Sequence, residues 1–154
     1  MIGYDGGKKV KGRKRHILVD TNGFLLEVLL TTANVQDRRG ALALLEETPR
    51  PSTVEVLFAD RGYSGPLVQQ AVEEWGCRFE PVPRESGRWL APGEAPPTRK
   101  TGFIVQKWRW IVERTFGWIS RQRRCARDYE EDTTSSRAWI FIAMSTIMLR
   151  RIVR

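Results

Sequence analysis

Runs of apolar residues in the first half of the chain predict four strands. Residues 13–20 and 24–32 are rich in Ile, Leu and Val, and the Asn22-Gly23 step between them is a strong signal for a tight hairpin turn. We therefore expect two antiparallel strands over these ranges. Residues 54–60 form a nearly continuous apolar run, which is typical of a buried strand that pairs in parallel with another. Residues 77–82 predict a further short strand.

Helical spacing of apolar residues, together with helix-ending residues, predicts four helices. Pro49 and Pro51 end the first helix, and Gly76 caps the second. Thr133, Thr134 and Ser135 offer N-caps for the last one. The expected helices span residues 38–47, 65–75, 103–125 and 135–152.

The last predicted helix is apolar around most of its surface, so we expect it to be buried. Residues 83–101 contain four prolines and two glycines, which predict a loop. A strand hairpin, then alternating strands and helices, then two helices indicate a mixed α/β class. The length of 154 residues fits one domain over residues 1–154.

Composition excludes several classes of protein. No uncharged apolar run reaches the 18 residues of a membrane span, and the first residues lack the apolar core of a secretion signal. The two cysteines, Cys77 and Cys125, form neither a disulfide framework nor a CxxC zinc motif. A single histidine makes His-based metal sites and triads improbable. We expect a basic globular protein of the reducing cytoplasm.

Positive charge is clustered along the chain. The chain has 26 Lys and Arg residues against 18 Asp and Glu residues, a net charge of +8. Residues 1–16 hold six basic residues against Asp5, and residues 99–127 hold nine against Glu113. Clustered positive charge favours a polyanion such as nucleic acid, although a solvated basic face without a partner is the alternative.

Two acidic residues are candidates for chemistry. Asp60 ends the apolar strand and precedes a glycine-containing turn, where open α/β sheets place their sites, although an Asp here can equally cap a turn. Glu113 stands among basic and apolar residues, with Arg109 four residues earlier, a spacing that also fits a simple helix salt bridge. Together the two carboxylates could hold Mg²⁺ or Mn²⁺ while neighbouring basic residues hold a phosphodiester.

Other residues with potential chemistry have simpler explanations. The tryptophans Trp75, Trp108, Trp110 and Trp118 are expected in the core rather than as platforms for stacking bases. His16 closes the run KGRKRH, where we expect it to pack or to contact phosphate. Both cysteines are expected to be small buried residues.

Four ordered blocks resemble the DDE-type transposases of bacterial insertion sequences, most closely the insertion-sequence-five family. The blocks are GYDGGKKVKGRKRHILVDTNG, TTANVQDR, FADRGYSG and RWIVERTFGWISRQRRCARDYE, and the resemblance runs from Gly3 to about Glu131. It implies an RNase H-like catalytic domain. It also implies two Asp and one Glu that bind two divalent metal ions, Mg²⁺ or Mn²⁺, for DNA strand cleavage and strand transfer. DNA partners (terminal repeats and target), possible homo-oligomers and a nucleoid-associated location are implied as well.

The resemblance assigns roles to individual residues. Asp60 matches the second catalytic Asp, Glu113 matches the catalytic Glu, and Arg109 matches an Arg expected to contact DNA phosphate. The family has a Lys about seven residues after the Glu, where this chain has Ser120 followed by Arg121. The expected DNA-binding residues are Lys11, Arg13, Arg15, Arg109, Arg121 and Arg124.

One departure from the family concerns its first catalytic Asp, which lies on a strand upstream of the GYD block. We expect that strand to be absent from this chain, and neither Asp5 nor Asp20 matches its Asp. Strands 13–20 and 54–60 should then each have an unpaired edge, which predicts a marginal fold and an incomplete, inactive metal site. The alternatives are a non-catalytic DNA-binding remnant, an upstream reading frame that supplies the strand, or an unrelated RNA- or ribosome-associated protein.

Overall fold

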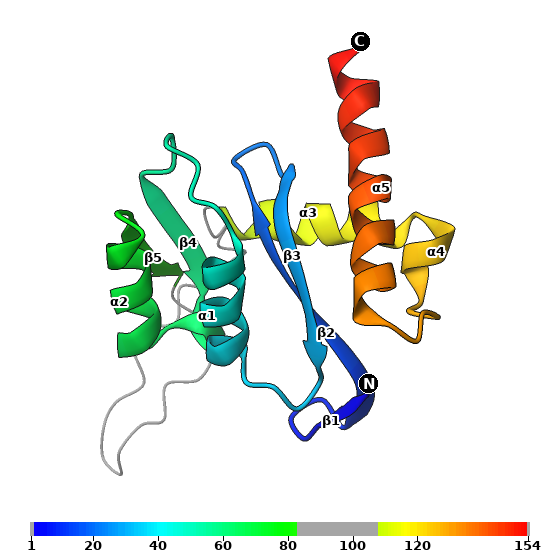
Figure 1. Cartoon of the computed structure of the whole chain (residues 1–154), viewed down its shortest axis with the longest axis horizontal. Helices are drawn as coiled ribbons and strands as arrows, with labels where there is room; N and C mark the ends of the chain where they lie inside the picture. The colour runs from blue at the N-terminus through cyan, green and yellow to red at the C-terminus, as the bar shows by residue number, and fades with distance from the viewer. Residues whose placement is uncertain (1, 83–107, 154) are drawn as a thin grey trace, which may run out of the picture.

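A computed structural model describes residues 2–82 and 108–153 and shows two small sheets with helices around them (Figure 1). Strands β1, β2 and β3 form an antiparallel sheet, and β4 and β5 form a separate parallel pair. The mixed α/β class is therefore confirmed. In chain order, the elements are β1 (Gly3–Asp5), β2 (Val10–Val19), β3 (Leu25–Thr32), α1 (Asp37–Glu47), β4 (Val56–Asp60), the 3₁₀ turn η1 (Arg61–Tyr63), α2 (Pro66–Glu74), β5 (Arg78–Val82), α3 (Arg109–Ser120), α4 (Arg123–Ala126) and α5 (Thr133–Ile152).

The predicted hairpin is confirmed as β2 and β3. Pairing runs from Arg13 opposite Thr32 to Val19 opposite Leu25. Gly23 has a φ of 82°, the left-handed conformation that favours glycine in a tight turn. The carboxylate of Asp20 closes the turn, because its Oδ1 accepts hydrogen bonds from the amides of Asn22 and Phe24 at 2.9 and 2.7 Å.

The parallel pair is confirmed, but the prediction that residues 54–60 are buried is wrong. Val56 to Asp60 pair with Arg78 to Val82, yet no residue of β4 is fully buried, Phe58 is 37% exposed and Asp60 is exposed. Helices α1 and α2 pack against one another beside this pair, and β5 occupies one edge of β4 (Figure 1). Within the described residues no strand pairs with its other edge, so the apolar run remains half open.

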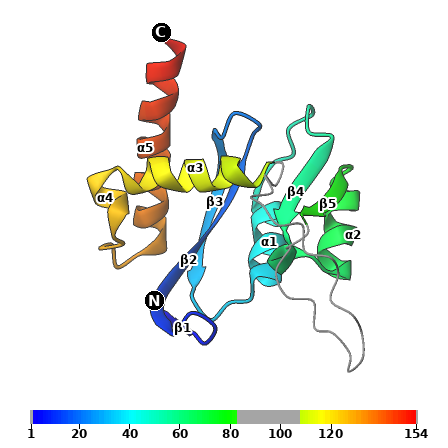
Figure 2. The same ribbon diagram turned by 180° about the vertical axis from the view of Figure 1, so that it is seen from behind.

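The helix expected over 103–125 is interrupted. Residues 103–107 lie outside the described part, α3 ends at Ser120, and the extended backbone of Gln122 (φ −82°, ψ 123°) separates it from α4. After this bend, Cys125 of α4 lies in the core and is 3% exposed. Figure 2 shows α3 crossing in front of the antiparallel sheet toward α5. The predicted loop over 83–101 also lies outside the described residues.

The last helix begins earlier than expected, and its burial is only partial. The carboxylate of Asp132 caps it, accepting hydrogen bonds from the amides of Thr134 and Ser135 at 3.1 and 3.3 Å, so none of the three predicted caps is used. An acid suits a helix N-terminus because it satisfies free amides and meets the positive end of the helix dipole. Four of its residues are buried, while Ile142 and Leu149 are 55% and 61% exposed.

Two separate apolar cores support the two sheets. The first lies between β3, α3, α4 and α5, around Val28, Ile119, Ile140 and Met144, all at most 1% exposed. The second joins α1 and α2 around Leu45, Val68, Val72 and Cys77. Helix α1 contacts β2, β3, η1 and α2, so it connects the two halves. Among the described helices, none has the length and hydropathy of a membrane span.

Candidate functional site

A groove of about 820 Å³ lies between the two sheets, with residues of α3 also lining it. Ile17 and Leu18 of β2 contribute one wall, and Leu57 and Phe58 of β4 contribute the other. Along residues 13–19, β2 pairs only with β3, and β4 pairs only with β5. In the part of the chain that the structure describes, the predicted unpaired edges of β2 and β4 are therefore present.

Asp60 lines this groove at the carboxyl end of β4. Its side chain caps η1, because Oδ1 accepts a hydrogen bond from the amide of Arg61 at 2.7 Å. The capping role that the sequence allowed is thus present. The cap uses one carboxylate oxygen of Asp60, which is an exposed residue. Glu113 lines the same groove.

Glu113 reaches the groove from α3, far away in the sequence. Its Oε1 accepts a hydrogen bond from Nε of Arg109 at 3.1 Å, so the helix salt bridge that the spacing allowed is also formed. The Glu113 side chain is 65% exposed and that of Arg109 is 39% exposed. An exposed i,i+4 pair contributes about 0.3–0.5 kcal/mol to the free energy of unfolding. The salt bridge between Arg109 and Glu113 therefore adds little to the stability of the fold.

The chemistry of the donor groups fits a hard divalent cation only in part. Asp60 and Glu113 supply carboxylate oxygens, which Mg²⁺ and Mn²⁺ prefer. Across residues 2–82 and 108–153, however, no group of three or more Asp, Glu, His or Cys side chains is close enough together to hold an ion. The described residues therefore form an incomplete ligand set.

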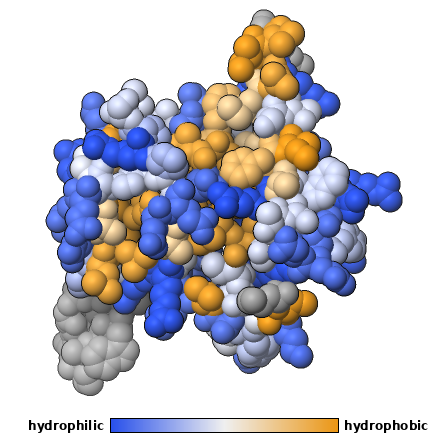
Figure 3. Space-filling model, in the orientation of Figure 1, coloured by the Kyte–Doolittle hydropathy of each residue, from blue (hydrophilic) through white to orange (hydrophobic). Residues whose placement is uncertain are grey.

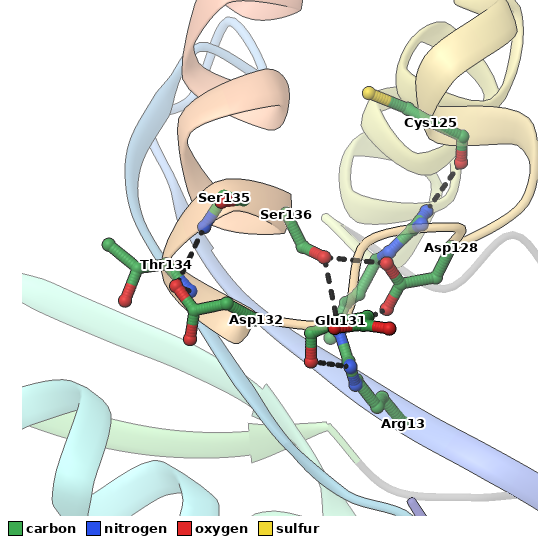
Figure 4. A network of polar contacts seen from close by, with 9 residues as sticks. Arg13, Cys125, Asp128, Glu131, Asp132, Thr134, Ser135 and Ser136 are labelled. Carbon is green, nitrogen blue, oxygen red and sulfur yellow. Dashed lines mark hydrogen bonds and ion pairs between the residues drawn. The ribbon is translucent and has the colours of Figure 1, made fainter. Parts of the chain in front are cut away.

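Three predicted DNA-binding residues, Lys11, Arg13 and Arg15, lie on the groove wall formed by β2. Lys11 is exposed, whereas Arg13 is held in a polar network (Figure 4). Arg13 pairs with Asp128 at 3.2 Å, and donates to the Ser136 hydroxyl at 3.2 Å and to the carbonyl of residue 131 at 2.5 Å. Its side chain is only 7% exposed, so Arg13 joins β2 to the segment before α5.

Arg15 has a similar internal contact. Its Nη1 donates to the carbonyl oxygen of Cys125 at 2.9 Å, near the end of the short helix α4. Burial raises the pKa of the Cys125 thiol, with the nearby Arg15 opposing that shift. Cys125 is thus a buried thiol, as predicted, and Cys77 is buried too.

The remaining predicted basic residues do not line the groove. Arg121 is exposed at the end of α3. Arg124 pairs with Glu130 at 3.3 Å and lies over the Trp139 ring at 4.9 Å. Ser120, which stands where the family has Lys, is exposed and donates its hydroxyl hydrogen to the carbonyl of Gly117 at 3.0 Å.

The sequence missed how His16 connects the two halves of the molecule. It is 1% exposed, with Nδ1 3.1 Å from the Tyr63 hydroxyl and Nε2 3.0 Å from the Thr31 hydroxyl. Burial lowers the pKa of His16, and burial raises the pKa of Tyr63 to about 12. Because Tyr63 ends the turn that Asp60 caps, His16 joins the antiparallel sheet to the Asp60 turn. The packing role predicted for His16 is confirmed, but only the fold could identify its partners.

Two further acids clarify the question of the first catalytic Asp. Oδ1 of Asp5 accepts hydrogen bonds from the amides of Gly7 and Lys8, and the bond from Lys8 contributes most to holding its pKa below the usual value. Asp37 also lines the groove and pairs with Lys14 at 3.1 Å, a position that the sequence had not suggested. Asp5 and Asp20 both have turn roles, which agrees with neither being selected.

One tryptophan assigned to the core is in fact exposed. Trp110 is 48% exposed, and the guanidinium of Arg114 lies 4.4 Å from its ring and 4.7 Å from the Trp118 ring. A cation-π stack of this kind lets an aromatic ring stay at the surface of α3. The other three tryptophans are half-buried, near the expected interior.

Comparison with known proteins supports the resemblance of the chain to DDE-type transposases. A family model for the transposase DDE domain matches residues 2–148. A candidate transposase for insertion sequence element IS402 from Burkholderia cepacia is 33% identical over 130 residues, covering 77% of this chain and 54% of that protein. A transposase for insertion sequence element IS1106 from Neisseria meningitidis serogroup B is 29% identical over 116 residues, covering 75% and 38%. The chain thus spans about half the length, or less, of these relatives. No solved structure shows a significant match.

Proposed function

Because the chain belongs to the DDE transposase family, we propose that it forms part of a catalytic domain that cleaves and joins DNA strands at the ends of an insertion sequence. The observation that carries this proposal is the placement of Asp60 and Glu113. They come from two distant segments, β4 and α3, yet line one groove. Each carboxylate has a modest structural role, and both remain exposed.

The basic residues around the groove support a DNA ligand. Lys11 and Arg109 line it from two different elements, β2 and α3. Their positive charges would meet phosphate oxygens, and Arg109 would hold both a phosphate and Glu113 in place. Arg121 and Arg124 extend the positive surface beyond the groove, whereas Arg13 and Arg15 would contribute mainly through the network that shapes its wall.

The finer fold assignment is also part of the proposal. We infer an RNase H-like sheet in which one further strand, carrying the first Asp, lies in the groove between β2 and β4. Support comes from the two edges without a strand partner in the described residues, both facing the same groove. Unpaired edges attract other strands, and filling this slot would satisfy both edges.

A divalent metal ion would be held by Asp60, Glu113 and that further carboxylate. Bound there, it would polarise a phosphodiester oxygen and activate water or a DNA 3′-hydroxyl. This chain's own residues would bind the DNA backbone and orient it beside Asp60 and Glu113. The two available carboxylates would bind the metal weakly by themselves.

A second function is favoured by the incomplete ligand set described above: salt-sensitive DNA binding without cleavage. Plasmid nicking in Mg²⁺ or Mn²⁺ distinguishes the two functions. Metal-dependent nicking that Asp60→Asn and Glu113→Gln each abolish, while Glu55→Gln leaves it unchanged, supports the catalytic proposal. Glu55 is an exposed acid that does not line the groove, so it is a matched control. Binding without nicking supports the second function.

Fluorescence anisotropy with a DNA duplex at several salt concentrations tests the binding surface. Removing one phosphate contact, by Lys11→Gln or Arg109→Gln, should reduce the slope of log K against log salt by about 1. Arg39→Gln is the control, because Arg39 is exposed on α1 and does not line the groove. Equal effects of all three substitutions would contradict the groove as the binding site, and absence of any binding would contradict both functions.

A further inference from the structure

Helix α5 has exposed large apolar residues along one face of its C-terminal half. Figure 1 shows its C-terminal half projecting beyond the body of the protein, and Figure 3 shows hydrophobic surface on that projecting end. The large residues on it are well exposed, with Ile142 at 55%, Leu149 at 61% and Ile152 at 75%. Large apolar side chains gathered on one surface in this way are typical of an interaction site.

The exposed residues repeat with the alternating spacing of three and four residues that defines a coiled-coil heptad. We call this stripe the α5 seam. All of its members are exposed: three at the first heptad position (Ser135, Ile142 and Leu149) and three at the fourth (Ala138, Ser145 and Ile152). At a rise of 1.5 Å per residue the seam is about 26 Å long.

We propose that the α5 seam binds the α5 seam of a second copy of this chain in an antiparallel helix pair. Aligned antiparallel, Ser135 lies opposite Ile152, and Ala138 lies opposite Leu149. Ile142 lies opposite Ser145. Every layer then joins one small residue to one large one, which is how facing positions interdigitate without voids or overlap.

A parallel pair lacks this complementarity. Ile142, Leu149 and Ile152 would each face their own copy, and Ser135, Ala138 and Ser145 would do the same, so three layers would be wide and three narrow. The residues that flank the seam are uncharged. Their charge therefore favours neither the parallel nor the antiparallel orientation. The size pattern therefore selects the antiparallel arrangement.

Charge at the two ends of α5 supports the same choice. The segment leading into the helix holds the acids Asp128, Glu130, Glu131 and Asp132, and its last turn holds Arg150 and Arg151. An antiparallel pair brings the acidic end of one copy near the basic end of the other. A parallel pair would place like charges side by side at both ends.

Sedimentation velocity of the whole chain, from low- to high-micromolar concentration, tests the pairing. We expect a reversible dimer, because one two-helix seam is a small interface. Leu149→Glu should weaken self-association by at least about a hundredfold, since two leucines are lost per dimer and each is worth tenfold or more. The substitution is at an exposed position, so circular dichroism should show an unchanged fold.

Leu67→Glu is the matched control. Leu67 is 68% exposed on α2, away from the seam, so its substitution should leave the dimer intact. A wild-type chain that stays monomeric throughout would overturn the proposal, and so would a Leu149→Glu chain that dimerises like the wild type. Loss of the dimer in Leu67→Glu with retention in Leu149→Glu would place the interface elsewhere and would also overturn it.

Oxidative cross-linking tests the orientation. Two chains that each carry one added surface cysteine, Ser135→Cys and Ile152→Cys, are mixed, with one carrying a mass tag. The native Cys77 and Cys125 are buried and do not compete. We expect the mixed disulfide to exceed both like-with-like disulfides, whereas a dominant Ile152→Cys self-link would contradict the antiparallel arrangement.

Discussion

The antiparallel half of the molecule closes around its core, whereas the parallel half leaves its first strand open. Val28 of β3 is fully buried beneath α5, together with Ile119, Ile140 and Met144. In β4 no residue is fully buried. The candidate site lies on the open side, where Asp60 ends β4. We therefore expect substitutions in the buried core to change the free energy of unfolding. Substitutions of the exposed acids that line the groove should instead change DNA cleavage.

The largest effect is expected from the closed half. Ile140→Ala removes a side chain that is 1% exposed and leaves a cavity, which should lower the free energy of unfolding by about 2–5 kcal/mol. Urea denaturation measures this change. Ile142→Ala, two residues along the same helix and 55% exposed, should change it by less than about 0.5 kcal/mol in the monomer. Equal losses would mean that α5 does not hold the core as described.

The contact between α1 and β2 is the next most sensitive point. A methyl group on Gly40 would lie 2.4 Å from Cε1 of His16, so Gly40→Ala should destabilise the protein by about 1–3 kcal/mol. Gly117 in α3 has nothing within 4 Å of its added methyl group, so Gly117→Ala should stabilise it by about 0.5–1 kcal/mol. Thermal unfolding gives both signs. A neutral Gly40→Ala would show that the two halves are loosely joined.

Acid should weaken this same contact before it affects the carboxylates. Burial lowers the pKa of His16, so the unfolded chain binds a proton that the folded chain resists, and stability is complete only above the unfolded value near 6.5. The melting temperature should fall as pH drops below about 6.5, toward the folded pKa. His16→Gln should remove this dependence above pH 5, whereas an unchanged profile would assign it to another group.

The smallest effect on stability is expected for the exposed side chains that line the groove. Glu113→Gln weakens an ion pair whose Glu side chain is 65% exposed, so the free energy of unfolding should change by about 0.5 kcal/mol or less. The same substitution should abolish any metal-dependent nicking. A loss of stability comparable with that of Ile140→Ala would instead make Glu113 a structural residue.

Local chemistry made most of the described elements predictable. Asn22-Gly23 marked the hairpin turn, and Gly76, with a φ of 73°, ended α2 as expected. The parallel pairing of β4 followed from its apolar run and from the helix between the strands. These signals depend on residues that are close together in the sequence, so they can be recognised without knowledge of the fold.

Long-range arrangement limited the other predictions. An apolar run predicted burial for β4 and for α5, yet burial depends on which elements lie against them, and each has an open side. The break after Ser120 is followed by a short helix whose Cys125 packs in a core built from distant segments. For the candidate site, residue type and resemblance selected Asp60 and Glu113. Their shared groove, and the contacts of His16 with Tyr63 and Thr31, required the fold.

The groove between the sheets has a mechanical consequence. A ladder of backbone hydrogen bonds is the stiffest connection in a sheet, and within the described residues none crosses from β2 to β4. The spacing between Asp60 and Glu113 is therefore set by softer side-chain contacts, through α1 and the His16–Tyr63 pair. Because these contacts are soft, the two carboxylates can move apart or together at low energetic cost. A third rigid element that bridged both edges would fix their distance.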